Sequence, residues 1–334
     1  TRWIPADRLA KVDPRAGDTM GRIYRVVPSG RKLRPVRDLT TLKGADLVAA
    51  LDTSNGTTRD LVHQLLLHQK DRSTEEPLAG LVSSSARPAV RAQAAAVLDG
   101  LKALTPESLR DALQDEDPRV RRHAVRLSET RAMSSPDLLE ACLQLSSDPD
   151  FTVRYQLVLS LGEWDKPEVA STLAEMACVD LEDSRFRAAV VSASTRWPQE
   201  VLKRLLTLPA SGARDALVSD LVSTAAAIAE QSSDFENLLD VLAVTTNETP
   251  SAWQMKGLAG LQRALKRREI PPSSLAGAGE IQAIYTAARS IVADEKAAVG
   301  DREAALKLFG QGLAGAEIEL PILSPLLKSS QIAV

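Results

Sequence analysis

The chain has 334 residues and a formal net charge of −3, so no global field favours nucleic acid or an anionic membrane surface. Hydrophobic residues make up 44% of the sequence but aromatic residues only 3%, so small and aliphatic side chains must fill the core. This composition favours close-packed helices over a β-sandwich, whose strands prefer aromatic and β-branched residues. No stretch approaches the roughly 18 apolar residues of a membrane span, and the first residues lack the layout of a signal peptide.

The first 37 residues differ in kind from the rest. The stretch GRIYRVVPSGRKLRP alternates in part between apolar and polar residues and then reaches a Pro-Ser-Gly turn. This pattern predicts a strand, a turn and a basic linker. Because a lone strand has no partner for its backbone groups, we interpret residues 1–37 as the end of a preceding β domain and its linker.

From about residue 40 an arginine recurs in a similar context, as in DPRVRRHAV and DFTVRYQLVL. Five stretches align on this arginine, with spacings of 32, 30, 33 and 33 residues. A fixed period of this size is the signature of a solenoid of stacked repeats. A first helix precedes the arginine-bearing helix, and four of these first helices should begin at a proline, which is favoured at the first helical position: Pro106, Pro136, Pro167 and Pro198. We therefore predict regular repeats of two helices, A and B, over residues 38–210.

Four of the five arginines have an acidic or amide residue four positions earlier, at the expected start of helix B. Such a residue caps a helix by accepting hydrogen bonds from its free backbone N–H groups. The arginine lies one turn into the helix, where it could reach the cap of the next unit. We predict that arginines and caps form a structural ladder between repeats, with the members Arg59, Arg91, Asp117, Arg121, Asp150, Arg154, Asp183 and Arg187. Arg87 replaces the acidic residue in the second unit, so at least one inter-repeat contact should be missing.

Beyond residue 210 the arginine spacing is lost, but apolar residues continue at helical spacing. The Pro-Pro-Ser-Ser and Gly-Ala-Gly sequences within residues 271–279 predict a loop. We interpret residues 211–334 as divergent helical repeats that are truncated at the C-terminus.

The D-P-x-V-R-x-x-A pattern of DPRVRRHAV, with its looser copies, resembles HEAT and HEAT-like helical repeats. This resemblance implies an all-α fold, a right-handed α-solenoid of HEAT-like helix pairs. A second resemblance covers residues 3–71, where DPRAGDTMGRIYRVVPSG and the following DLTTLKGADLVAAL are similar to the propeller-to-HEAT junction of membrane-bound dehydrogenases of planctomycete-type bacteria. It implies a propeller-like domain upstream, a periplasmic location and haem c in the parent protein. The chain itself has no CxxCH motif for haem attachment.

No nucleophile, phosphate-binding or metalloprotease motif is present: the chain lacks GxSxG, GxGxxG, a Walker loop and HExxH. We interpret its histidines as structural residues because their spacing does not suit a metal site, and its cysteines as small core residues because they lie in apolar runs: His63, His68, His123, Cys142 and Cys178. We therefore predict no catalytic residue, cofactor or metal in this chain.

Three functions fit this sequence. The favoured one is a non-catalytic scaffold whose extended concave surface binds a protein or neighbouring domains of the same polypeptide. The alternative is the structural middle segment of a periplasmic multidomain dehydrogenase or cytochrome c electron-transfer protein, with its redox domains outside this chain. The third is a nucleic-acid binder that uses the basic stretches 119–131 and 262–269; acidic residues beside the first stretch argue against it.

Overall fold

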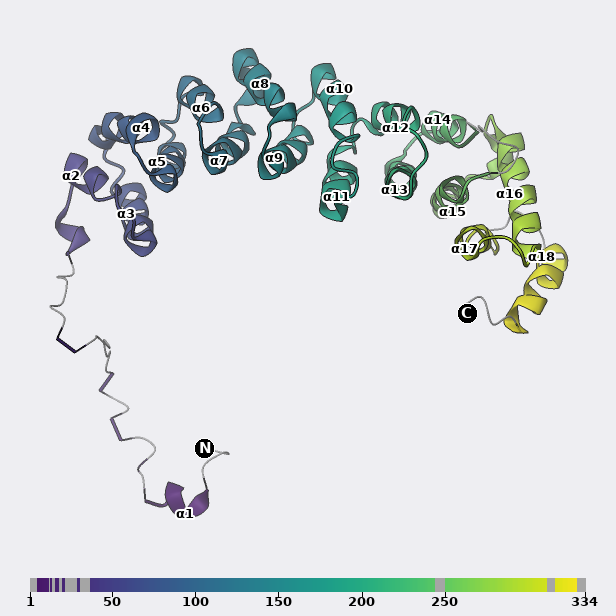
Figure 1. Ribbon diagram of the computed structural model, residues 1–334, viewed down its shortest axis with the longest axis horizontal. Helices are drawn as coiled ribbons and strands as arrows, with labels where there is room; N and C mark the ends of the chain where they lie inside the picture. Colours follow the sequence, from purple (N-terminus) through teal and green to yellow (C-terminus); the bar gives the residue numbers. More distant parts are fainter. Residues whose placement is uncertain are drawn as a thin grey trace. The chain divides into compact units, whose positions relative to one another are not determined.

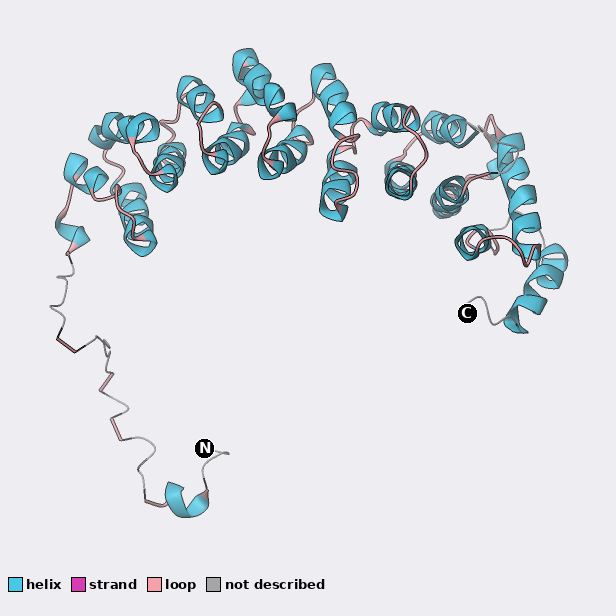
Figure 2. Cartoon of the chain, viewed as in Figure 1, coloured by secondary structure: helices cyan, strands magenta, loops and turns pink. Residues whose placement is uncertain are grey.

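The computed structural model describes residues 5–11, 13, 16–17, 20–21, 29–30, 37–243, 250–310 and 316–328. These residues contain 18 α-helices, several short 3₁₀ turns and no strand (Figure 2). The chain divides into two compact units, Thr1–Leu42 and Lys43–Val334. The fold is the all-α solenoid of helix pairs that the sequence predicts.

The first unit contains helix α1 (Ala6–Leu9) and a 3₁₀ turn at Leu39–Thr41. Asp38 begins this turn by accepting a hydrogen bond of 2.9 Å from the backbone N–H of Thr40. Residues 22–28, which hold the predicted strand, lie outside the described residues. The interpretation of residues 1–37 as the end of a β domain therefore stays a prediction.

In the second unit, the helices alternate between two rows, A and B (Figure 1). Row A contains α2 (Gly44–Ala49), α4 (Glu75–Ser84), α6 (Pro106–Leu113), α8 (Pro136–Leu143), α10 (Pro167–Met176), α12 (Pro198–Leu206), α14 (Ser232–Ala243) and α16 (Ala278–Ala293). Row B contains α3 (Gly56–Gln69), α5 (Pro88–Gly100), α7 (Pro118–Ser128), α9 (Phe151–Leu161), α11 (Ser184–Ala193), α13 (Gly212–Ile228), α15 (Ala252–Arg267) and α17 (Val299–Leu306). Helix α18 (Ala316–Leu323) packs against α16. Successive B helices are in contact along the whole row, as are most successive A helices, so each repeat packs against the next one.

The local sequence signals explain where these helices begin. Helices α6, α8, α10 and α12 each begin at the proline that was predicted to be their first residue. Five B helices are capped by a side chain that accepts a backbone N–H of the first turn: Asn55, Asp117, Asp150, Asp183 and Ser211. Proline and a capping side chain both suit positions where backbone N–H groups have no partner within the helix.

Small residues let the helices of row B approach closely, which explains how a chain poor in aromatics fills its core. Helix α15 crosses α13 at Gly260, where an added Cβ would lie 2.5 Å from Ser223 Oγ and 3.1 Å from Ser223 Cα. One turn earlier, a Cβ at Gly257 would lie 3.2 Å from Val222 Cγ1. Among the larger side chains, Trp164 and Phe186 are fully buried.

Within the part of the chain that the structure describes, none of the helices combines the length and apolar character that crossing a membrane requires.

Candidate functional site

The recurring arginines occupy equivalent positions on the B helices. In six consecutive repeats, from α3 to α13, the guanidinium Nη1 donates a hydrogen bond to the backbone carbonyl six residues earlier, in the turn between helices A and B. The donors of this bond are Arg59, Arg91, Arg121, Arg154, Arg187 and Arg214. Arg214 continues the series beyond residue 210, and the sequence analysis missed it because it follows Arg187 by only 27 residues.

Three of these arginines also bind a carboxylate of the following repeat. Arg121 donates from Nε and Nη2 to the two oxygens of Asp148, at 2.7 and 2.9 Å, and Arg91 binds Asp115 in the same bidentate way, at 2.7 Å for both bonds. Arg154 donates to one oxygen of Asp180, at 2.9 and 2.6 Å. Hydrogen bonds to these carboxylates raise the pKa of Arg91 and of Arg121.

These acceptors correct the predicted ladder. The arginines were expected to reach the caps Asp117, Asp150 and Asp183, but they bind aspartates two or three residues before each cap. The caps are already engaged within their own helix: Asp150, for example, accepts from the backbone N–H and hydroxyl of Thr152. The true acceptors lie in the A–B turn and are Asp115, Asp148 and Asp180.

The contacts form a continuous arginine network across the central repeats. The carboxylate of Asp115 accepts from Arg91 while its backbone carbonyl accepts from Arg121. Asp148 repeats this arrangement with Arg121 and Arg154. Asp115 and Asp148 also accept the backbone N–H of Asp117 and Asp150 respectively, at 2.8 Å. Each aspartate therefore fixes the turn of its own repeat and receives the arginine of the preceding one.

The network ends where the turn lacks an aspartate. Ser85 stands at the position equivalent to Asp115, and Arg59 instead donates to the side chain of Gln93 on α5, at 3.2 Å. The contact between an arginine and a carboxylate is therefore missing between the first and second units, where the replacement of the acidic residue by Arg87 predicted a missing contact. At the other end, Arg187 reaches the carbonyl of Leu181, and no carboxylate among the described residues lies within ion-pair distance of it.

A further inter-repeat ion pair was not foreseen from the sequence. Arg131, which lies off the repeat period, donates to Asp99 at 2.5 Å and to the carbonyl of Leu127 at 3.0 Å. Its side chain is 20% exposed, so it does not stand on a solvated face. No sequence pattern indicates this pair, because Asp99 lies on α5 and Arg131 follows α7 in the next repeat.

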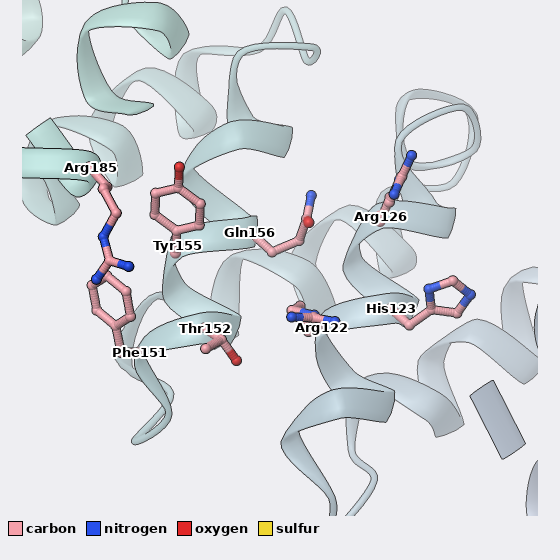
Figure 3. Close-up of a pocket in the computed structure, with 8 residues that line it drawn as sticks. All are labelled: Arg122, His123, Arg126, Phe151, Thr152, Tyr155, Gln156 and Arg185. Atoms are coloured by element: carbon pink, nitrogen blue, oxygen red, sulfur yellow. The ribbon is translucent and has the colours of Figure 1, made fainter. Parts of the chain in front are cut away.

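A pocket of about 410 Å³ opens on the B row beside the network (Figure 3). Three consecutive B helices supply its walls, namely α7, α9 and α11. The residues that line it are Arg122, His123, Arg126, Phe151, Thr152, Tyr155, Gln156 and Arg185. Arg122 and Tyr155 each follow a network arginine directly in the sequence, so one residue of each pair packs between repeats and the next lines the pocket.

The pocket lining is cationic and aromatic. Arg122 and Arg126 are exposed on one face of α7 and form no ion pair with any residue that the structure describes. Arg185 is held by Asp183 at 2.6 Å and its guanidinium lies 5.8 Å from the centre of the Phe151 ring. The half-buried His123 has a lowered pKa, first because of burial and then because of the charges of Arg126 and Arg122. The imidazole is therefore biased towards its neutral form.

The remaining candidates are the other two histidines and the two cysteines. No cluster of three or more His, Cys, Asp or Glu residues that could hold a metal ion occurs among the described residues. His68 is exposed, whereas His63 is half-buried, and burial lowers its pKa. Cys142 is buried, which raises the pKa of its thiol to about 11, and burial also raises the pKa of Cys178.

Comparison with known families agrees with this geometry. The HEAT repeats family matches residues 106–195, which span the three helix pairs from α6 to α11. These are the pairs that carry Arg121, Arg154 and Arg187. No curated protein matches the chain. The match and the paired helices together support a HEAT-like repeat protein, a class of helical scaffolds that generally mediate interactions.

Proposed function

We propose that this chain is a non-catalytic scaffold whose B-helix row binds a protein, either a separate partner or another domain of the same polypeptide. The observation that carries the proposal is the arginine network. It ties the turn of each central repeat to the next one, from α5 to the turn before α11. Side chains on successive B helices are thereby held at fixed spacing, which is what an extended recognition surface requires.

The proposal can be tested by site-specific photo-crosslinking in cells of the source organism. A photoreactive amino acid would replace Ala92 on α5 or Ala188 on α11, both accessible on B helices, and Glu107 on α6 or Ser171 on α10 as matched A-row controls. We expect discrete protein adducts from the B-row positions and none, or far weaker ones, from the A-row positions. Equal crosslinking from both rows, or no adduct from either, would contradict the proposal.

The alternative of a segment from a periplasmic dehydrogenase or cytochrome c protein rests on residues 3–71 alone. The family match lies elsewhere, at residues 106–195, and says nothing about redox chemistry. This alternative predicts propeller blades encoded upstream of the segment and a CxxCH motif downstream. Sequencing the gene on both sides is the direct test, and haem staining of the full gene product is the matching biochemical one.

A further inference from the structure

We infer that the pocket between α7, α9 and α11 binds an extended acidic segment of a partner protein, with its carboxylates on Arg122 and Arg126 and an aromatic or aliphatic neighbour against the rings of α9. The inference rests on the proposed scaffold function and adds the chemistry of the partner. It concerns the residues of the pocket in Figure 3, none of which belongs to the arginine network.

The first argument is charge. Arg122 and Arg126 lie four residues apart, so they point from the same face of α7. Two carboxylates close to α7 in the fold, Asp99 on α5 and Glu129 directly after α7, are already engaged: Asp99 binds Arg131, and Glu129 accepts from Ser160 at 2.7 Å. The two guanidinium groups therefore stay available for an external carboxylate, which they can bind through charge-assisted hydrogen bonds.

The second argument is the aromatic floor. Phe151 and Tyr155 stack with ring centroids 5.9 Å apart, and Arg185 lies over Phe151. Asp183 accepts two hydrogen bonds from Arg185, at 3.2 and 2.6 Å, and these hold the guanidinium over the ring without a ligand. Aromatic and arginine side chains are among the residues that contribute most to binding at protein interfaces.

The third argument favours a peptide over a nucleic acid. A nucleic acid needs a row of cations that follows its backbone, often six to ten phosphate contacts. The B helices on either side offer no such row: the only cation of α5 is Arg91 and the only cation of α13 is Arg214, and both are buried within the fold. The cationic surface is therefore short and isolated on a chain whose net charge is −3.

The dimensions fit a short peptide. Neighbouring helix axes lie about 9–10 Å apart, so the step from α7 to α11 covers roughly 20 Å. An extended peptide advances about 3.3 Å per residue, and roughly six residues would cross the pocket. Side chains alternate between the two sides of an extended peptide, so a carboxylate and an aromatic ring two residues apart would face the pocket together.

The test uses the full chain and a fluorescein-labelled peptide of about ten residues built from Glu-Glu-Phe-Phe repeats, which places Glu and Phe alternately on each side. Fluorescence anisotropy should show saturable binding that weakens with salt, and the Gln-Gln-Phe-Phe analogue should bind at least ~10-fold more weakly. The double variant Arg122→Ala/Arg126→Ala should lose at least ~10-fold in affinity. Its matched control is Arg263→Ala/Arg267→Ala, which removes another exposed arginine pair, also four residues apart, from the B helix α15.

A second readout locates the ligand. A carboxylate on Arg122 and Arg126 would offset the positive charges that lower the pKa of His123, so saturating peptide should raise that pKa in an NMR titration. The other charged groups acting on His123 are Asp99 and His63, so Asp99→Asn and His63→Gln serve as background variants. The shift on peptide binding should persist in both of them.

Three outcomes would overturn the inference: no binding of the acidic peptide, equal loss of affinity in the two double variants, or tighter binding of a single-stranded oligonucleotide than of the peptide. If the peptide does not bind, or if both double variants lose affinity equally, the scaffold proposal still stands as long as crosslinking from the B row captures a protein. If the peptide binds but crosslinking from the B row captures no protein, only the scaffold proposal is contradicted.

Discussion

Replacing Arg121 tests whether the arginine network stabilises the repeats. Its side chain is 13% exposed and that of Asp148 only 2%, and four hydrogen bonds leave the guanidinium: two to the carboxylate of Asp148 and two to the carbonyls of Asp115 and Glu116. Arg121→Ala leaves the buried carboxylate of Asp148 with one hydrogen-bond donor from the described part of the chain, the backbone N–H of Asp150. Breaking a buried pair from one side in this way should cost about 2–4 kcal/mol.

Urea unfolding followed by far-UV circular dichroism measures this loss. Arg126→Ala is the control on the same helix, because Arg126 is exposed and should change the free energy of unfolding by less than about 0.5 kcal/mol. A double-mutant cycle with Asp148→Ala should give a coupling of at least ~1 kcal/mol, since the two residues contact each other directly. Because repeats stabilise their neighbours, the transition should also broaden. Equal midpoints for Arg121→Ala and Arg126→Ala, or a coupling near zero, would refute this reasoning.

Three further predictions concern the stability of the fold. Gly260→Ala should destabilise the protein in chemical unfolding because the new Cβ would meet Ser223, whereas Gly80→Ala on α4, where nothing lies within 4 Å, should stabilise it by ~0.5–1 kcal/mol. Trp164→Phe should cost about 1 kcal/mol more than Trp197→Phe in the same assay, because Trp164 donates to the Glu129 carbonyl at 3.1 Å while the buried N–H of Trp197 has no hydrogen-bond partner among the described residues. The hydrogen bond from Arg185 lowers the pKa of Asp183 from 3.8 to about 2. The ionised carboxylate of Asp183 therefore stabilises the fold above pH 4, and this stabilisation is lost as the pH falls towards 2. Asp183→Asn should make the free energy of unfolding less dependent on pH in this acid range.

The sequence contained most of the architecture because its repeat places the same local signals in every unit. Proline at the first helical position and an acidic or amide cap act within one helix, so both can be read without knowing how repeats stack. The acceptors of the network could not be assigned in this way. Asp115 and Asp148 each lie two residues before a cap. Whether the arginine of the preceding repeat binds the cap or this aspartate depends on how far its side chain reaches, which the sequence does not show.

Sequence spacing also did not predict the contacts that depend on how two repeats pack against each other. Arg214 occupies the same structural position as Arg187, but a shorter connection moves it out of period. Arg131 has no counterpart at the repeat period, yet neighbouring helices bring it to Asp99. The pocket needs residues from α7, α9 and α11 at once, and only the stacked arrangement shows that they share a face. Asp115 and Asp148 each lie six residues before a network arginine, and this shared spacing could have predicted these two acceptors.

The last prediction separates the network from the pocket, because the two use adjacent residues on the same helices. Arg154 packs between repeats through Asp180, while the next residue, Tyr155, lines the pocket. Arg154→Ala should lower the free energy of unfolding by ~1–3 kcal/mol and, in protein that is still folded, weaken the Glu-Glu-Phe-Phe peptide severalfold, because α9 is then less firmly held against α11. Arg122→Ala should do the reverse, weakening the peptide strongly with little change in stability. If Arg154→Ala loosens the fold but leaves the affinity unchanged, the network stabilises the stack without shaping its binding surface.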